Sequence, residues 1–141
     1  MSSTTAFVIL AFSRHSTVGA ILPSSSRLAD AMARAAVGAQ ELIELGAGTG
    51  AITAALCRCH PGVPILAVEM EGELAHCLRE RFPMIEVRAG AAHEVLCESQ
   101  RGAVAAVLIS SLPFRSLPPR LRIRSSMAIE RFLIERPASR L

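Results

Sequence analysis

Short apolar runs alternate along this chain with longer segments in which apolar residues recur every three or four positions. The short runs predict β-strands and the longer segments predict amphipathic helices. One helix is expected between each pair of strands, with a further helix before the first strand and another after the last. The expected strands are residues 41–45, 65–69, 84–87 and 103–109, and the outer helices are residues 26–37 and 120–135.

Strands that alternate with helices in this way are typical of right-handed βαβ units, which build an open parallel α/β sheet with helices on both faces. Residues 103–109 are apolar without interruption, which indicates a strand buried on both of its faces. We expect the four strands in the spatial order 3-2-1-4. In such sheets a ligand binds outside the carboxyl ends of the strands, so the residues that follow each strand are the candidates for function.

The first strand runs into a turn with glycine at alternate positions, Gly46, Gly48 and Gly50, and a helix follows at once. Glycine adopts positive φ and lets a ligand approach the backbone, and the N-terminus of a helix presents unpaired N–H groups to the same space. Glu44 precedes this turn by two residues. A carboxylate there repels a pyrophosphate and attracts a cationic group, which favours S-adenosylmethionine over NAD. Glu69, at the end of the second strand, can accept hydrogen bonds from both hydroxyls of a ribose.

Four stretches, residues 19–25, 44–50, 67–69 and 110–114, resemble class I S-adenosylmethionine-dependent methyltransferases. The resemblance is closest to the bacterial phospholipid N-methyltransferases that methylate phosphatidylethanolamine, and to the related rRNA adenine dimethyltransferases. It implies a Rossmann-like sheet and an enzyme that methylates a phospholipid amine, with an rRNA adenine N6-methyltransferase-like enzyme as the alternative. The adenine dimethyltransferases usually have Asn before Leu-Pro-Phe/Tyr, where this chain has Ser111, and this favours the lipid branch.

The resemblance also implies roles for individual residues. Glu44 and the glycine turn would hold the methionine end of the cofactor, and Glu69 would hold the ribose. Ala91 stands where the family has an acid that binds the adenine amino group, and the loop after the last strand would form the floor under the methyl acceptor. The expected cofactor-binding residues are Glu44, Gly46, Ala47, Gly48, Gly50, Glu69, Met70, Ala91, Ala92 and Ser110, and the expected catalytic residues are Ser111, Leu112, Pro113 and Phe114.

Cysteine and histidine residues gather in the helix after the glycine turn, at Cys57, Cys59 and His60. Residues two apart on a helix point roughly 200° apart, so these side chains cannot share an ion and no metal site is expected. We expect Cys59 to pack against the core and Cys57 to be exposed. The four cysteines of the chain form no disulfide framework, which predicts a cytoplasmic protein with reduced thiols.

Charge is distributed unevenly along the chain. Residues 1–114 carry eight Arg against nine Glu and one Asp, whereas residues 115–141 carry seven Arg against two Glu. The basic part can bind phosphate groups of a lipid or a nucleic acid, and a solvated helix face explains it equally well. Residues 4–12 are apolar but too short for a bilayer span of about 20 residues. They predict a short helix that lies either on the domain, which is slightly favoured, or on a membrane surface, which would place the cytoplasmic protein at the inner membrane face.

The family that the chain resembles continues its sheet beyond the fourth strand, but residues 120–141 contain no glycine and no further strand pattern. We therefore expect a C-terminally truncated sheet in a domain over residues 1–119, followed by a divergent basic helical tail over residues 120–141. The strand at 103–109 would then be an exposed edge that invites self-association. A truncated, inactive cofactor-binding remnant is the remaining hypothesis.

Overall fold

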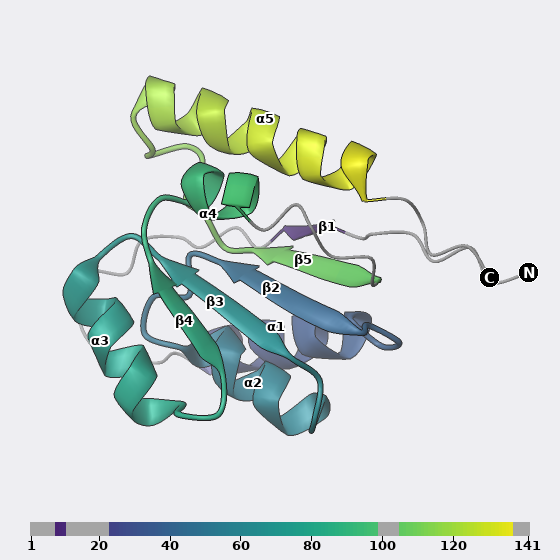
Figure 1. Ribbon diagram of the computed structural model, residues 1–141. Helices are drawn as coiled ribbons and strands as arrows, with labels where there is room; N and C mark the ends of the chain where they lie inside the picture. The colour runs from purple at the N-terminus through teal and green to yellow at the C-terminus, as the bar shows by residue number, and fades with distance from the viewer. Residues whose placement is uncertain (1–7, 11–22, 99–104, 137–141) are drawn as a thin grey trace, which may run out of the picture.

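The computed structural model describes residues 8–10, 23–98 and 105–136. Within them, five parallel strands form one sheet with helices on both faces (Figure 1). In chain order the elements are β1 (Val8–Leu10), α1 (Pro23–Ala35), β2 (Glu41–Leu45), α2 (Ala51–Cys59), β3 (Ile65–Glu69), α3 (Gly72–Arg81), β4 (Glu86–Ala89), α4 (Ala92–Glu98), β5 (Ala106–Ser110) and α5 (Pro119–Glu135).

The strand β2 lies in the middle of the sheet, and the full order is β1-β5-β2-β3-β4. Glu44 of β2 pairs with Ala67 of β3 on one side and with Ile109 of β5 on the other. The chain passes from β2 to β3 and β4 and then crosses to β5, so the strand order reverses at the carboxyl ends of β2 and β5. The predicted order 3-2-1-4, which corresponds to β4, β3, β2 and β5, is confirmed.

A fifth strand, β1, covers the outer edge of β5. Val8 pairs with Leu108 and Leu10 pairs with Ser110 in parallel register. The expectation of a helix over residues 4–12 is therefore wrong at β1, because a run this short carries no period that separates helix from strand; the rest of that segment lies outside the described residues. Since β1 occupies the edge that we expected to be bare, self-association through this edge loses its physical basis.

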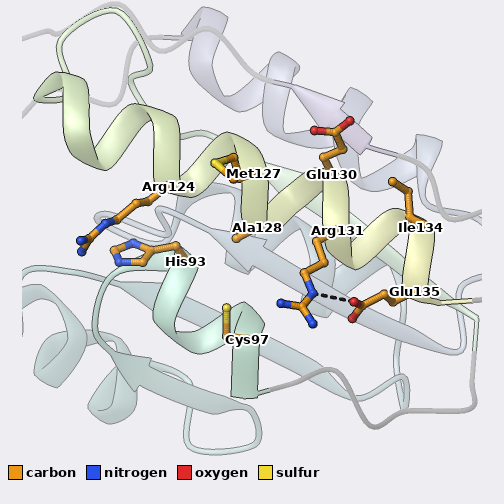
Figure 2. Close-up of a pocket in the computed structure, with 9 residues that line it drawn as sticks. All are labelled: His93, Cys97, Arg124, Met127, Ala128, Glu130, Arg131, Ile134 and Glu135. Atoms are coloured by element: carbon orange, nitrogen blue, oxygen red, sulfur yellow. Dashed lines mark hydrogen bonds and ion pairs between the residues drawn. The ribbon is translucent and has the colours of Figure 1, made fainter.

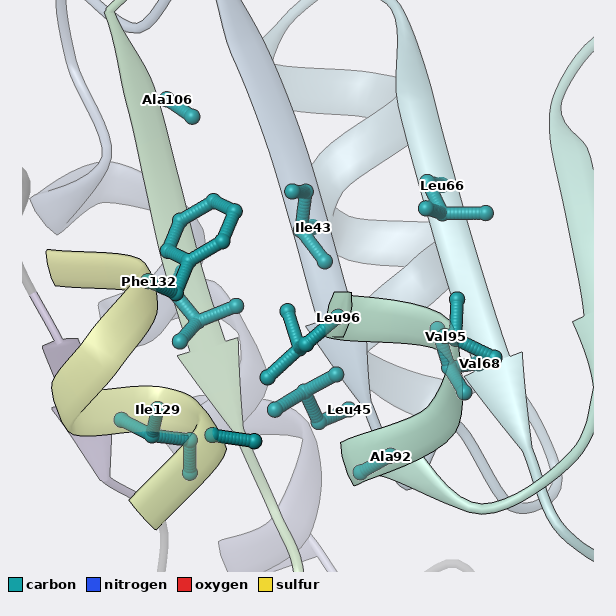
Figure 3. Packing of buried hydrophobic residues seen from close by; sticks show 12 residues of the cluster. Ile43, Leu45, Leu66, Val68, Ala92, Val95, Leu96, Ala106, Ile129 and Phe132 are labelled. Carbon is teal, nitrogen blue, oxygen red and sulfur yellow. The ribbon is translucent and has the colours of Figure 1, made fainter. Parts of the chain in front are cut away.

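The sheet buries one apolar cluster on the face of α4 and α5 and two on the opposite face, the second of them under α3. On one face, α4 and α5 pack against β2, β3 and β5, and Leu96 and Phe132 lie over Ile43, Leu45 and Leu66 (Figure 3). On the opposite face, α1 and α2 cover the other side of the sheet. All residues of β5 are buried, as the apolar run predicted. The helix α5 therefore belongs to the same core as the strands.

Several local expectations differ from the structure: α1 begins at Pro23 rather than residue 26, and β5 begins at Ala106 rather than residue 103. The strand β4 begins at Glu86 rather than residue 84, because Met84 lies in the preceding turn with 73% of its surface exposed. In α2, Cys57 is half-buried between two clusters and Cys59 is exposed, which reverses the prediction for these two side chains. None of the helices in the described ranges is long and apolar enough to cross a bilayer.

Candidate functional site

The carboxyl ends of the central strands meet at one edge of the sheet, where backbone hydrogen bonds join the loops that follow them. The amide of Gly46 donates to a carbonyl of β3 at 2.9 Å. The amide of Gly90 donates to the Glu69 carbonyl, and the amide of Ser111 donates to the Leu45 carbonyl, both at 3.0 Å. The loops that the sequence selected after β2, β3, β4 and β5 are thus adjacent in space.

The glycine turn combines two packed positions with one open position. Gly46, Gly48 and Gly50 have φ values of 77°, 55° and 85°, in the left-handed region that favours glycine. A Cβ atom on Gly46 would lie 3.2 Å from Leu112, and one on Gly50 would lie 2.7 Å from the ring of Phe82. A Cβ atom on Gly48 would meet no atom of the described residues within 4 Å. The middle of the turn therefore faces open space, where a ligand can approach its backbone.

The carboxylate of Glu69 is held in place by two backbone amides. The amide of Gly48 donates to Oε2 at 2.7 Å, and the amide of Glu71 donates to Oε1 at 2.9 Å. A carboxylate offers about four acceptor positions, so both oxygens can still accept a hydroxyl group. Glu69 is thus oriented before any ligand arrives, directly beside the open position of the glycine turn.

Glu44 is a fully buried carboxyl group with an incomplete set of hydrogen bonds. The Thr53 hydroxyl donates to Oε2 at 2.6 Å, whereas Oε1 is buried and accepts no hydrogen bond within the described part of the chain. Burial raises the pKa of Glu44 from 4.5 to about 7; bonds from the Thr53 hydroxyl and amide oppose this rise, and the charge of Glu69 adds to it. A buried oxygen without a donor is costly and suits a cationic ligand group that supplies one.

The loop after β4 carries a carboxylate that the sequence analysis did not assign. Ala91, which occupies the position of the family's acid, donates a weak hydrogen bond from its amide to Glu94 Oε2 at 3.4 Å. Glu94 lies in the first turn of α4, three residues after Ala91. Ala92 is 6% exposed and packs in the core, whereas Met70 is 59% exposed after β3. Glu94 therefore brings a carboxylate to the loop where Ala91 lacks one.

The loop after β5 contacts and supports the glycine turn. The hydroxyl of Ser111 donates to the Gly46 carbonyl, and Leu112 and Phe114 pack against the cluster under α4 and α5. The carbonyl of Leu112 accepts the Phe114 amide at 2.8 Å, and the carbonyl of Pro113 accepts two later amides of the loop. Ser110, at the end of β5, is buried, and the Leu112 amide lies 3.4 Å from its hydroxyl. The loop is thus held by its own hydrogen bonds and is attached to the glycine turn.

Sequence reasoning missed three side chains that shape this edge. Thr53 and Glu94 are described above, and Arg81 donates to the Thr49 carbonyl at 3.0 Å from the end of α3. Glu94 had a signal, because an acid three residues after a helix cap is typical of a capping box. Arg81 and Thr53 had none, since their partners depend on how α2 and α3 pack.

No protein-family model matches the chain. An ornithine lipid N-methyltransferase of Singulisphaera acidiphila is 33% identical over 122 residues, which cover 79% of this chain and 62% of that protein. An uncharacterized methyltransferase-like protein of Schizosaccharomyces pombe is 39% identical over 59 residues, which cover 42% of this chain and 23% of that protein. The chain thus spans less than two thirds of the length of either relative.

Solved methyltransferase structures share the fold. The amino pentose methyltransferase of calicheamicin biosynthesis from Micromonospora echinaspora, with S-adenosylmethionine bound, has a TM-score of 0.54 at 17% identity, over 78% of this chain and 45% of that one. An O-methyltransferase of Bacillus cereus in complex with S-adenosylhomocysteine has a TM-score of 0.55 at 18% identity, over 77% and 53%. The chain therefore has the Rossmann-like fold of the class I S-adenosylmethionine-dependent methyltransferases, as predicted.

Proposed function

We propose that this chain binds S-adenosylmethionine and is the cofactor-binding part of an N-methyltransferase that acts on a lipid amine. The cofactor proposal rests on the buried Glu44 Oε1, which accepts no hydrogen bond from the described residues. It lies beside a glycine turn whose middle position these residues leave open. The cofactor offers an ammonium group and a ribose, and the chain offers Glu44 for the first and the oriented Glu69 for the second. Glu94 would accept the adenine amino group in place of the missing acid at Ala91.

The cofactor supplies an activated methyl group, and the residues of this chain supply orientation. Glu69 fixes the ribose relative to the glycine turn, and the turn is itself fixed by Ser111 from below. The acceptor nitrogen must enter as a neutral amine, because a protonated amine has no lone pair with which to attack. The Ser111 hydroxyl can accept an N–H of that amine while it donates to Gly46, since a hydroxyl offers one donor and two acceptor positions.

The lipid acceptor is supported by the ornithine lipid N-methyltransferase relative, which aligns with most of this chain. It is also supported by Ser111, which stands where the adenine dimethyltransferases usually have Asn. An rRNA acceptor is the alternative. The two acceptors are distinguished by which of them receives a labelled methyl group.

Calorimetric titration with S-adenosylmethionine tests the cofactor site. We expect binding by the wild type and loss of binding by Glu44→Gln, because the glutamine keeps the shape and the bond from Thr53 but removes the charge that pairs with an ammonium. The exposed Glu73→Gln in α3 is the matched control and should bind as the wild type does. Equal binding by Glu44→Gln and wild type would refute the role of Glu44, and absence of binding by a folded wild type would refute the cofactor.

Transfer of a labelled methyl group tests the acceptor. Mixed micelles that contain phosphatidylethanolamine or an ornithine lipid are compared with rRNA, each in the presence of labelled S-adenosylmethionine. Label in a lipid, abolished by Glu44→Gln, is the expected result. Label in the RNA would replace the proposal by the alternative, and label in neither acceptor, with the cofactor bound, would indicate a remnant without turnover.

A further inference from the structure

The outer face of α5 carries an apolar stripe that no part of the described structure covers. Ile123, Met127 and Ile134 expose 57%, 63% and 73% of their surfaces. Their spacings of four and seven residues place them on one side of a helix with 3.6 residues per turn. The buried residues of the same helix, which include Ala128 and Phe132, lie on the opposite side. The exposed Glu130 lies on the same side as these three residues, so the outer face is apolar except for one carboxylate, and the opposite face serves the core.

Arginine side chains flank this stripe. By the same helical period, Arg120, Arg124 and Arg131 follow one side of it, the side toward α4. Figure 2 shows Arg124 and Arg131 on the α4 side of α5, beside a groove of about 460 Å³ that Met127 and Ile134 of the stripe also line. Arg131 is paired with Glu135 at 2.5 Å, so Arg120 and Arg124 supply most of the excess positive charge.

We propose that the outer face of α5 docks on a lipid bilayer that contains anionic headgroups, with its stripe at the acyl boundary and its arginines at the phosphates. Each half of the surface supports this occupant, because a helix that lies in the interface buries apolar side chains and places basic ones at the headgroups. A nucleic acid would use the arginines but leave the apolar stripe in water. A second copy of the chain would bury the stripe but bring the arginines of the two copies together.

The position of α5 also connects this surface with the candidate site. The loop after β5 runs directly into α5, and Figure 1 shows that α5 begins at the edge of the sheet where the strands end. A docked α5 would hold that edge close to the headgroups. This link between docking and the site rests on the proposed function, because a lipid amine would reach the site from the membrane surface.

Co-sedimentation of the full chain with vesicles, without cofactor, tests the docking surface. We expect binding to vesicles of phosphatidylcholine mixed with phosphatidylglycerol, and weaker binding to phosphatidylcholine alone. The triple variant Ile123→Gln, Met127→Gln and Ile134→Gln should lower the affinity about tenfold or more, because bilayer binding scales with the buried apolar area. The control is Val37→Gln with Met84→Gln, since both apolar side chains are at least as exposed as the stripe and lie in turns away from α5.

A second pair of variants tests the charge. Arg120→Gln and Arg124→Gln should each lower the affinity about fivefold at low salt, whereas Arg27→Gln and Arg34→Gln on α1 should not. Unchanged vesicle binding by both the apolar and the charge variants would overturn the proposal. So would binding to a short RNA that exceeds binding to vesicles, or a stable dimer in light scattering that the triple variant abolishes.

The docking test and the enzyme test fail independently. If α5 docks but no lipid amine in micelles is methylated, the docking surface stands and the proposed acceptor is refuted. If micellar lipid is methylated and vesicles are not bound, the proposed function stands and the role of α5 is refuted.

Discussion

Replacement of Glu44 by glutamine is expected to stabilise the fold at alkaline pH and to leave its stability at acidic pH unchanged. The pKa of Glu44 rises from 4.5 to about 7 because the carboxyl group is fully buried. The folded protein therefore binds this proton more tightly than the unfolded chain does. Between these two values the folded state carries more protons, so the free energy of unfolding falls as the pH rises through the window.

The size of the effect follows from the two pKa values. The difference between 4.5 and about 7 corresponds to about 3 kcal/mol, lost between acidic and neutral pH. Glutamine has the shape of the protonated acid, since its carbonyl can accept the Thr53 hydroxyl and its amide group occupies the place of Oε1. The variant should therefore match the wild type at about pH 4.5 and exceed it by about 3 kcal/mol above about pH 7.

Urea unfolding at a series of pH values measures this difference directly. The wild type, Glu44→Gln and the exposed control Glu73→Gln are compared, and equal slopes against urea show that the unfolded states are alike. The control should follow the wild-type curve. A Glu44→Gln advantage that does not grow with pH, or a variant that is less stable than the wild type at alkaline pH, would refute the assignment of a costly buried carboxylate.

Two further variants test how the glycine turn is held. Gly50→Ala should lower the free energy of unfolding by about 3 kcal/mol, because it combines positive φ with a clash at 2.7 Å. Gly62→Ala has positive φ but no described atom within 4 Å, and should lower it by about 1 kcal/mol. Equal losses of stability in urea unfolding would show that the clash at residue 50 is relieved. Ser111→Ala should cost about 1 kcal/mol, since it removes the hydroxyl that donates to the turn. A thermal melt that matches the wild type would show that this bond contributes nothing.

The strands that could be predicted are those whose apolar runs are bounded by clear turn residues. The strands β2 and β3 were located to the residue, because each is flanked by clear turn signals and the glycine turn follows β2. The candidate site could be predicted for the same reason, since each of its loops directly follows a strand of a parallel sheet.

The parts that could not be predicted depend on contacts distant in sequence. The strand β1 exists because its backbone pairs with β5, about a hundred residues later, and its short apolar run contains no sign of this. The orientation of α2, which buries Thr53 and exposes Cys59, depends on how the helix packs between two clusters. Tertiary packing of this kind overrides the local period from which the faces were predicted.

The helix α5 is fixed at both ends to elements that form the candidate site. Its first turn follows the loop that supports Gly46, and Phe132 near its end is fully buried over the sheet. Just after it, Arg136 pairs with Glu41 at 2.7 Å, at the start of the same strand that carries Glu44 at its other end. With its inner face held in this way, α5 keeps its outer stripe in a fixed orientation relative to β2. A surface that docked through this stripe would therefore set the orientation of the site, which a flexible basic tail could not do.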